Sequence, residues 1–95
     1  MKKALFISFN QAYGEDVTSL LERHGQRGFT RWDEVSGRGS ENGEPHFGNH
    51  AWPVMNIAVL TFVDADKAPA ILEDLRALDA ASPELGLRTF SWNTD

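Results

Sequence analysis

Apolar residues are grouped along the chain in four short runs that predict β-strands. Residues 4–9 are almost continuously apolar, and residues 55–63 (MNIAVLTFV) offer apolar side chains to both faces of a strand. Residues 28–35 alternate between apolar and polar positions, which predicts a strand with one side partly facing solvent. Residues 87–92 (LRTFSW) form the last predicted strand.

Two segments between these runs have apolar residues at helical spacing. The first spans residues 15–24, and Gly25 is its expected stop. The second runs to about Ala81, and we expect Asp64 or Asp66 to cap its beginning. The apolar stripe of this second helix comprises Ala68, Ile71, Leu72, Leu75 and Leu78.

The resulting order, βαββαβ, predicts a single α+β domain over residues 1–95 with a ferredoxin-like fold. In that fold two helices cover one face of a four-stranded antiparallel sheet, and the other face stays open. Three of the predicted strands carry apolar residues on both faces, and a large exposed apolar face is unusual in a soluble monomer. We therefore expect a partner to cover the open face, most simply another copy of the chain.

Composition and charge narrow the function classes. The net charge is −5 over 95 residues, which argues against a nucleic-acid binder or a protein that associates with anionic membranes. There is no cysteine, so disulfides and thiolate sites are excluded. The apolar run near the N-terminus is too short for a signal peptide, and no run is long enough for membrane insertion, so a cytoplasmic location is expected. A local anion site is still possible on this acidic protein, because four arginines lie close together in the sequence: Arg23, Arg27, Arg31 and Arg38.

The segment 36–49 is the richest in chemistry. It contains four glycines and a proline, so it predicts a loop of about 14 residues, and loops of that length are commonly functional or disordered. Arg38 stands between Gly37 and Gly39, where exposed backbone N–H groups and a guanidinium could hold a phosphate or carboxylate. The same composition fits a flexible, solvated hairpin loop, and the residues alone leave both interpretations open.

The run Glu34-Val35-x-Gly37-x-Gly39-x-x-x-Gly43 at the end of the second predicted strand resembles the PII signal-transduction family. In that family such a run opens a long T-loop. The resemblance implies a homotrimer whose open sheet faces line the trimer core. It also implies intersubunit clefts that bind a small ligand, such as an adenine nucleotide or another anion.

By this resemblance, Gly37, Arg38, Gly39 and Arg88 are the candidate ligand-binding residues. The T-loop-like segment 36–49 would signal to a target protein, such as a membrane transporter.

The chain also departs from the PII pattern. Residues 81–87 (ASPELGL) have one glycine and no lysine where the family carries a glycine-rich, lysine-containing phosphate loop. The segment 36–49 has no tyrosine for covalent modification. The chain thus resembles a divergent PII-like protein, and ATP binding and 2-oxoglutarate sensing do not carry over to it from the family.

A second cluster, Glu44, His46 and His50, has the ligand types that suit Zn²⁺, Ni²⁺ or Cu²⁺. Pro45 and Gly48 argue against a helix that would bring the two imidazoles together, and ordinary loop histidines explain the pattern as well. If the cluster binds metal, the alternative function is that of a CutA-like divalent-metal-binding protein.

The remaining candidates have structural explanations. Trp32, Trp52 and Trp92 are expected to pack a subunit interface, with ligand stacking as the alternative. His24 is expected to interact with the C-terminus of its helix. No set of nucleophile, base and orienting residue can be named, so we expect no enzyme, and a small-molecule enzyme is the third hypothesis.

Overall fold

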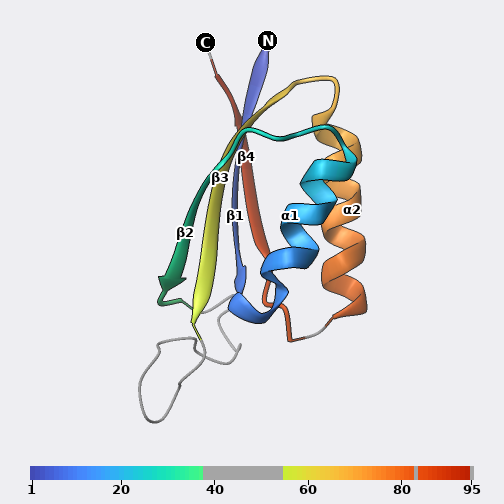
Figure 1. Ribbon diagram of the computed structural model, residues 1–95. Coiled ribbons are helices and arrows are strands. Elements are labelled where there is room, and N and C mark those ends of the chain that lie inside the picture. The colour runs from blue at the N-terminus through green and yellow to red at the C-terminus, as the bar shows by residue number, and fades with distance from the viewer. Residues whose placement is uncertain (38–54, 83, 95) are drawn as a thin grey trace.

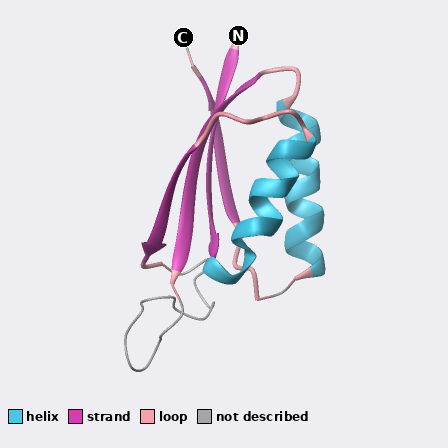
Figure 2. Ribbon diagram, in the orientation of Figure 1, coloured by secondary structure: helices cyan, strands magenta, loops and turns pink. Residues whose placement is uncertain are grey.

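Four antiparallel strands form one sheet, and both helices lie on one face of it (Figure 1; Figure 2). The computed structural model describes residues 1–37, 55–82 and 84–94. The sheet order is β2-β3-β1-β4, which confirms the predicted ferredoxin-like α+β fold. In chain order the elements are β1 (Lys2–Asn10), the 3-10 turn η1 (Gln11–Tyr13), α1 (Gly14–Arg23), β2 (Thr30–Val35), β3 (Asn56–Asp64), α2 (Ala68–Ala81) and β4 (Arg88–Asn93).

The hydrophobic core lies between the sheet and the helices. Alternate residues of the two central strands face this layer, and the apolar stripes of both helices close it. Leu72 and Leu78 pack at its margin. Its fully or almost fully buried members include Leu5, Ile7, Phe9, Val17, Leu20, Leu21, Val59, Val63, Ile71 and Leu75.

A glycine begins the first helix, and another follows its C-cap residue. A Cβ on Gly14 would lie 2.9 Å from Arg31 Nη2 and 3.0 Å from Ile57 Cδ1, so the start of α1 packs closely on the sheet. Gly25 has a φ of 74°, and the backbone N–H of Gln26 donates to Leu21 O over 2.9 Å. This is the left-handed glycine stop that the sequence predicts.

The predicted cap of α2 is wrong. The N-cap residue is Lys67, and no side chain caps the helix there. Asp64 is unavailable because its carboxylate accepts a 2.6 Å bond from Lys2 Nζ, while its carbonyl accepts the Lys67 N–H at 2.9 Å. Pro69 occupies the first turn of the helix, where a missing N–H costs little.

A β-bulge interrupts the pairing of β2 with β3. Trp32 lies opposite Ala58, so a regular antiparallel ladder would place Glu34 opposite Asn56. Val35 lies there instead, and Glu34 has a φ of 60°, in the left-handed region. The strict alternation predicted for residues 28–35 is therefore wrong at the end of the strand, since one extra residue shifts the faces.

The face of the sheet opposite the helices is apolar and bears no helix in the part of the chain that the structure describes. Large side chains from three strands are about half exposed on it: Trp32 (45%), Phe62 (50%), Phe90 (61%) and Trp92 (49%). We call this surface the open face. In the strand register, Ala4 lies opposite both Phe62 and Trp92. The prediction that the strands are apolar on both faces is thus confirmed.

Candidate functional site

The sheet end opposite the two termini brings together two of the predicted ligand-binding residues (Figure 1). At this end β2 and β1 finish, and β3 and β4 begin. Gly37 follows β2, and Arg88 is the first residue of β4. The other two, Arg38 and Gly39, lie outside the described residues.

Gly37 lies directly against Asn56. A Cβ at position 37 would be 2.5 Å from Asn56 Nδ2, so only glycine fits this position without a shift. The Asn56 side chain is buried, with 2% exposure, and its Nδ2 donates to Ser8 Oγ at 3.4 Å. A buried amide therefore lies directly beside the chain as it leaves β2.

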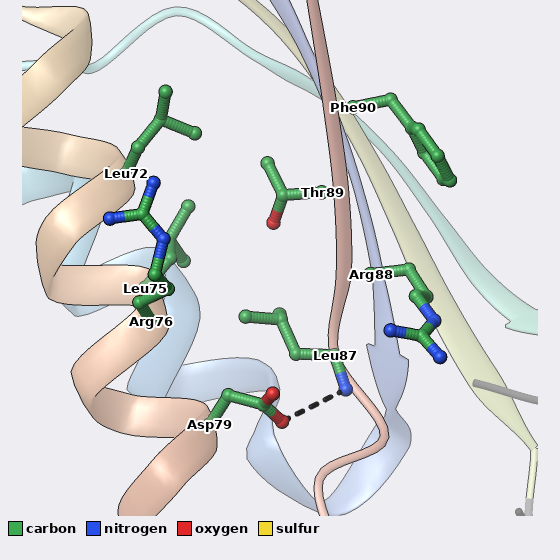
Figure 3. A pocket seen from close by; sticks show the side chains of 8 residues that line it. All are labelled: Leu72, Leu75, Arg76, Asp79, Leu87, Arg88, Thr89 and Phe90. Atoms are coloured by element: carbon green, nitrogen blue, oxygen red, sulfur yellow. Dashed lines mark hydrogen bonds between the residues drawn. The ribbon is translucent and has the colours of Figure 1, made fainter. Parts of the chain in front are cut away.

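Arg88 is exposed and lies opposite Ser8 in the register. Its side chain extends from the side of β4 that faces away from α2 (Figure 3). It therefore belongs to the open face, on the same edge of that face as Ser8 and Asn56. An exposed guanidinium in this place can pair with a phosphate or a carboxylate.

Backbone and amide hydrogen bonds hold this end of the sheet together. Gln11 N–H donates to Met55 O at 2.9 Å, and Asn10 N–H donates to Leu85 O at 2.8 Å. The Asn10 side chain accepts from Ala12 N–H at 2.9 Å and donates to Glu84 O at 3.2 Å. Asn10 thus makes a turn and ties the segment before β4 to the end of β1, so its amide is already committed.

Sequence reasoning missed Asn56 and Ser8. Both lie within runs that predict strands, and only their faces distinguish them. The one available signal is polarity, because an asparagine at the start of a strand that is otherwise buried needs a hydrogen-bond partner.

Three of the four predicted arginines, Arg23, Arg27 and Arg31, are among the described residues, and they do not form one cluster. Arg31 Nε donates to Asp33 Oδ1 at 2.5 Å and lies beside the start of α1. Arg23 is in the last turn of that helix, and Arg27 is in the connection after it, at the end of the sheet where the termini lie. An anion site built from Arg23, Arg27 and Arg31 together is therefore not supported by the described part of the chain.

His24 is the C-cap residue of α1, and its Nε2 lies 2.6 Å from Asp74 Oδ2 on α2. It joins the two helices, away from the candidate site, and its partner is the carboxylate of the other helix.

The predicted metal ligands Glu44, His46 and His50 lie outside the described residues, as does Trp52. Within residues 1–37, 55–82 and 84–94 no group of three histidine, aspartate or glutamate side chains could hold a metal ion. The metal site stays a prediction. Over the same ranges, no helix is long and apolar enough to cross a membrane.

The far end of the open face carries an ion pair. Lys2 and Asp64 lie directly opposite each other in the strand register. The hydrogen bond from Lys2 Nζ, followed by the attraction of its charge, lowers the pKa of the Asp64 carboxyl below its ordinary value. The open face is therefore polar at both ends and aromatic in the middle.

Comparison with known proteins gave matches only among solved structures. No family model matches the sequence, and a search of curated proteins found no match. The structure of CPII, a nitrogen regulatory PII-like protein from Thiomonas intermedia K12 bound to ADP, AMP and bicarbonate, matches with a TM-score of 0.76 and 24% identity. The match covers 98% of this chain and 89% of that one.

Two further structures match with a TM-score of 0.68 over 98% of this chain. One is a protein from Thermus thermophilus that is described as PII-like, with 20% identity and 86% of its chain covered. The other is a DUF3240 family protein from Shewanella baltica, with 15% identity and 89% covered. These likenesses extend over almost the whole chain, and they establish that this protein has the fold of the PII-like proteins, as the sequence resemblance predicts.

Proposed function

We propose that this protein is a PII-like regulatory protein that assembles as a homotrimer and binds an adenine nucleotide or another small anion between its subunits. The ligand occupies the sheet end at which β2 finishes and β4 begins. Its binding changes the conformation of the T-loop-like segment 36–49, and this change is passed to a partner protein.

The observation that carries the proposal is the structural match with CPII, whose structure contains ADP, AMP and bicarbonate. A second CPII structure contains ADP and bicarbonate, with a TM-score of 0.74 to this chain. A shared fold alone does not establish a shared ligand. The local features of this chain must therefore support the same chemistry.

The open face supports the assembly. Phe62, Phe90, Trp92 and Trp32 expose aromatic surface on one side of the sheet. Removing such surface from water is favourable by roughly 25 cal/mol for each Å². A second and third copy of the chain would supply the apolar surface that covers it, and closed rotational symmetry lets each copy use the same patch.

The sheet end at which β2 finishes and β4 begins, called here the ligand end, supports anion binding. Arg88 supplies a guanidinium, and Gly37 supplies a backbone that approaches its surroundings without a Cβ. The predicted residues Arg38 and Gly39 follow immediately in the chain. Gly37 lies against the buried side chain of Asn56, which favours a preformed backbone at this position and lowers the entropy lost on binding.

Isothermal titration calorimetry with ADP, AMP, ATP and bicarbonate tests the proposal. We expect saturable binding of at least one adenine nucleotide and a roughly tenfold weaker Kd in Arg88→Ala, since a charge-assisted hydrogen bond is lost. Arg38→Ala is expected to have an effect of at least the same size. Arg27→Ala is the matched control, because Arg27 is exposed at the opposite end of the sheet.

Light scattering supplies the second measurement. A particle of three times the 10.6 kDa chain mass is expected. A stable monomer at micromolar concentration contradicts the intersubunit cleft. If no nucleotide binds and Zn²⁺, Ni²⁺ or Cu²⁺ gives heat that His46→Ala with His50→Ala abolishes, the CutA-like alternative replaces the nucleotide proposal.

A further inference from the structure

The segment that joins α2 to β4 is fixed to the ligand end by one buried side chain and two hydrogen bonds. Leu85 is completely buried in the core. The backbone N–H of Asn10, the last residue of β1, donates to Leu85 O at 2.8 Å. The Asn10 side chain donates to Glu84 O at 3.2 Å. The backbone of Glu84 therefore has a defined position, although its side chain is exposed.

Glu84 lies close to both described ligand residues. Its partner Asn10 is opposite Asn56 in the strand register, and a Cβ on Gly37 would lie 2.5 Å from Asn56 Nδ2. Arg88 begins β4 only four residues after Glu84, so their Cα atoms are at most about 14 Å apart. The end of α2 and the end of β1 lie together at this end of the sheet (Figure 1).

Negative charge predominates among the described residues around the ligand end. Arg31 Nε already donates to Asp33 Oδ1 at 2.5 Å. Arg76 Nη1, on α2, donates to Glu73 Oε2 at 2.8 Å. Beyond these two pairs, the structure describes one arginine and several acids at this end: Arg88 against Glu15, Asp16, Glu34, Asp79 and Glu84. An anionic group can pair with Arg88, but further negative charge meets repulsion.

Two of these acids belong to the part of the chain that leads to Arg88. Asp79 Oδ1 accepts the backbone N–H of Leu87 at 3.3 Å, so it helps to hold the beginning of β4. Glu84 meets Asn10 through its backbone carbonyl, and its carboxylate is exposed. A substitution at position 84 therefore changes the charge near Arg88 and leaves the backbone contacts in place.

We propose that Glu84 is a specificity-determining residue, which restricts the ligand end to nucleoside monophosphates such as AMP and disfavours ADP and ATP. The inference rests on the proposed function, because it assumes that a nucleotide binds at this end. The single phosphate group pairs with the Arg88 guanidinium. A second or third phosphate extends into the field of the Glu84 carboxylate.

The chemistry of phosphates explains this selection. A guanidinium binds one phosphate group through two parallel hydrogen bonds. Each further phosphate brings negative charge to an end where carboxylates already predominate, and the repulsion extends over about 8 Å at physiological ionic strength. Mg²⁺ neutralises phosphate charge in many nucleotide sites. Within residues 1–37, 55–82 and 84–94, however, no three histidine, aspartate or glutamate side chains could hold a metal ion together.

Isothermal titration calorimetry of the full chain with adenosine, AMP, ADP and ATP tests the proposal, with and without Mg²⁺. AMP should bind most tightly. Adenosine should bind roughly tenfold more weakly than AMP, because it has no phosphate for Arg88. ATP should also bind roughly tenfold more weakly than AMP, with ADP between them. Added sodium chloride should narrow the difference between AMP and ATP, because it screens the repulsion.

Two variants identify the carboxylate responsible. Glu84→Gln removes the charge at nearly constant shape, so it should strengthen ATP binding several-fold and leave AMP binding nearly unchanged. Glu84→Lys reverses the charge, and ATP should then bind at least as tightly as AMP. A residue with a merely structural role would change the affinities of AMP and ATP by the same factor.

Glu22→Lys is the matched control for Glu84→Lys. Glu22 is exposed in the last turn of α1, near the opposite end of the sheet (Figure 1). The substitution changes the net charge of the chain by the same amount. It should leave the ratio of the AMP and ATP affinities unchanged, because Glu22 is far from the ligand end.

The selection by Glu84 is overturned if ATP binds the native protein as tightly as AMP, with or without Mg²⁺. It is also overturned if Glu84→Lys leaves the ratio of the two affinities unchanged. In both cases a nucleotide still binds, so the proposed function stands. If bicarbonate alone binds, the selection among nucleotides fails and anion binding stands. If neither the native protein nor Glu84→Lys binds any of these ligands, both proposals fail together.

Discussion

The two faces of the sheet use the same strands for different purposes. On the helix face, Leu5, Ile7 and Phe9 are completely buried by α1 and α2. On the open face, Phe62 and Phe90 keep half or more of their surface exposed. The sequence pattern shows both faces as apolar, since strand residues alternate with a period of two. Only the placement of the helices shows which face the chain buries by itself.

This difference separates folding from assembly. The helix face contains a continuous core and accounts for the stability of the single chain. The open face adds apolar area that one chain leaves in contact with water, and this area becomes favourable only when another surface covers it. Substitutions on the two faces should therefore have different consequences, and the following experiments measure that difference.

The largest effect is expected on the helix face. Phe9→Ala should lower the free energy of unfolding by about 3–5 kcal/mol, because it removes a large buried side chain and leaves a cavity. Urea unfolding measures the loss. Phe90→Ala removes the same atoms from the open face, and at concentrations where the chain is monomeric it should cost far less. Similar losses for both variants would contradict the division of roles.

The second effect concerns assembly. Phe90→Ser with Trp92→Ser should disrupt the proposed trimer, since each buried aromatic side chain contributes about 1.5–3 kcal/mol to a covered surface. Light scattering should show the mass of one chain, and circular dichroism should show an intact fold. If the double variant keeps the mass of the native protein, the open face does not form the assembly interface.

A third, smaller loss of stability is expected at Gly37, where β2 leads into segment 36–49. Gly37→Ala places a methyl group 2.5 Å from Asn56 Nδ2, and the overpacking should cost about 1–3 kcal/mol. Gly28→Ala is the control, because a Cβ there meets no atom within 4 Å. Adding Asn56→Ser to Gly37→Ala should recover part of the loss, which a double-mutant cycle would detect. Equal losses at both glycines would show that the contact with Asn56 is unimportant.

The smallest effect is expected at the rim of the open face. The folded pKa of Asp64 is lowered from its ordinary value of 3.8, so its pair with Lys2 stabilises the fold above that pH. This contribution is lost as pH falls through the lowered pKa. Lys2→Met should return the Asp64 pKa toward 3.8 in a carboxyl-detected titration. Added salt should weaken the shift in the native protein, because the pair is exposed.

Periodicity and glycine position were sufficient to predict the order of the elements, the stop of α1 at Gly25 and the open apolar face. They were insufficient where tertiary contacts decide between local alternatives. Asp64 is a good capping residue, yet Lys2 lies opposite it in the sheet and takes its carboxylate. The bulge at Glu34 requires a left-handed residue that is not glycine, and no local sequence pattern predicts it.

The candidate site was predicted only in part for a related reason. The glycine-rich run identified Gly37, and its resemblance to the PII family gave it a role. Its partner Asn56 is 19 positions further along the chain, so their contact exists only after β2 and β3 have paired. His24 likewise finds Asp74 only once the two helices lie side by side. Residues 38–54 stay at the level of prediction, and they include Arg38 and the three proposed metal ligands.

The hydrogen bonds from Thr94 to Lys2 have a practical consequence for building sensors from this protein. The Thr94 hydroxyl donates to Lys2 O at 2.8 Å, and its N–H donates to the same oxygen at 3.1 Å. The start of β1 and the end of β4 are thus adjacent. They lie at the sheet end opposite Gly37 and Arg88 (Figure 1). A fluorescent domain fused after β4 would therefore stand clear of the ligand end, so a signal change on ligand addition would report motion transmitted through the sheet.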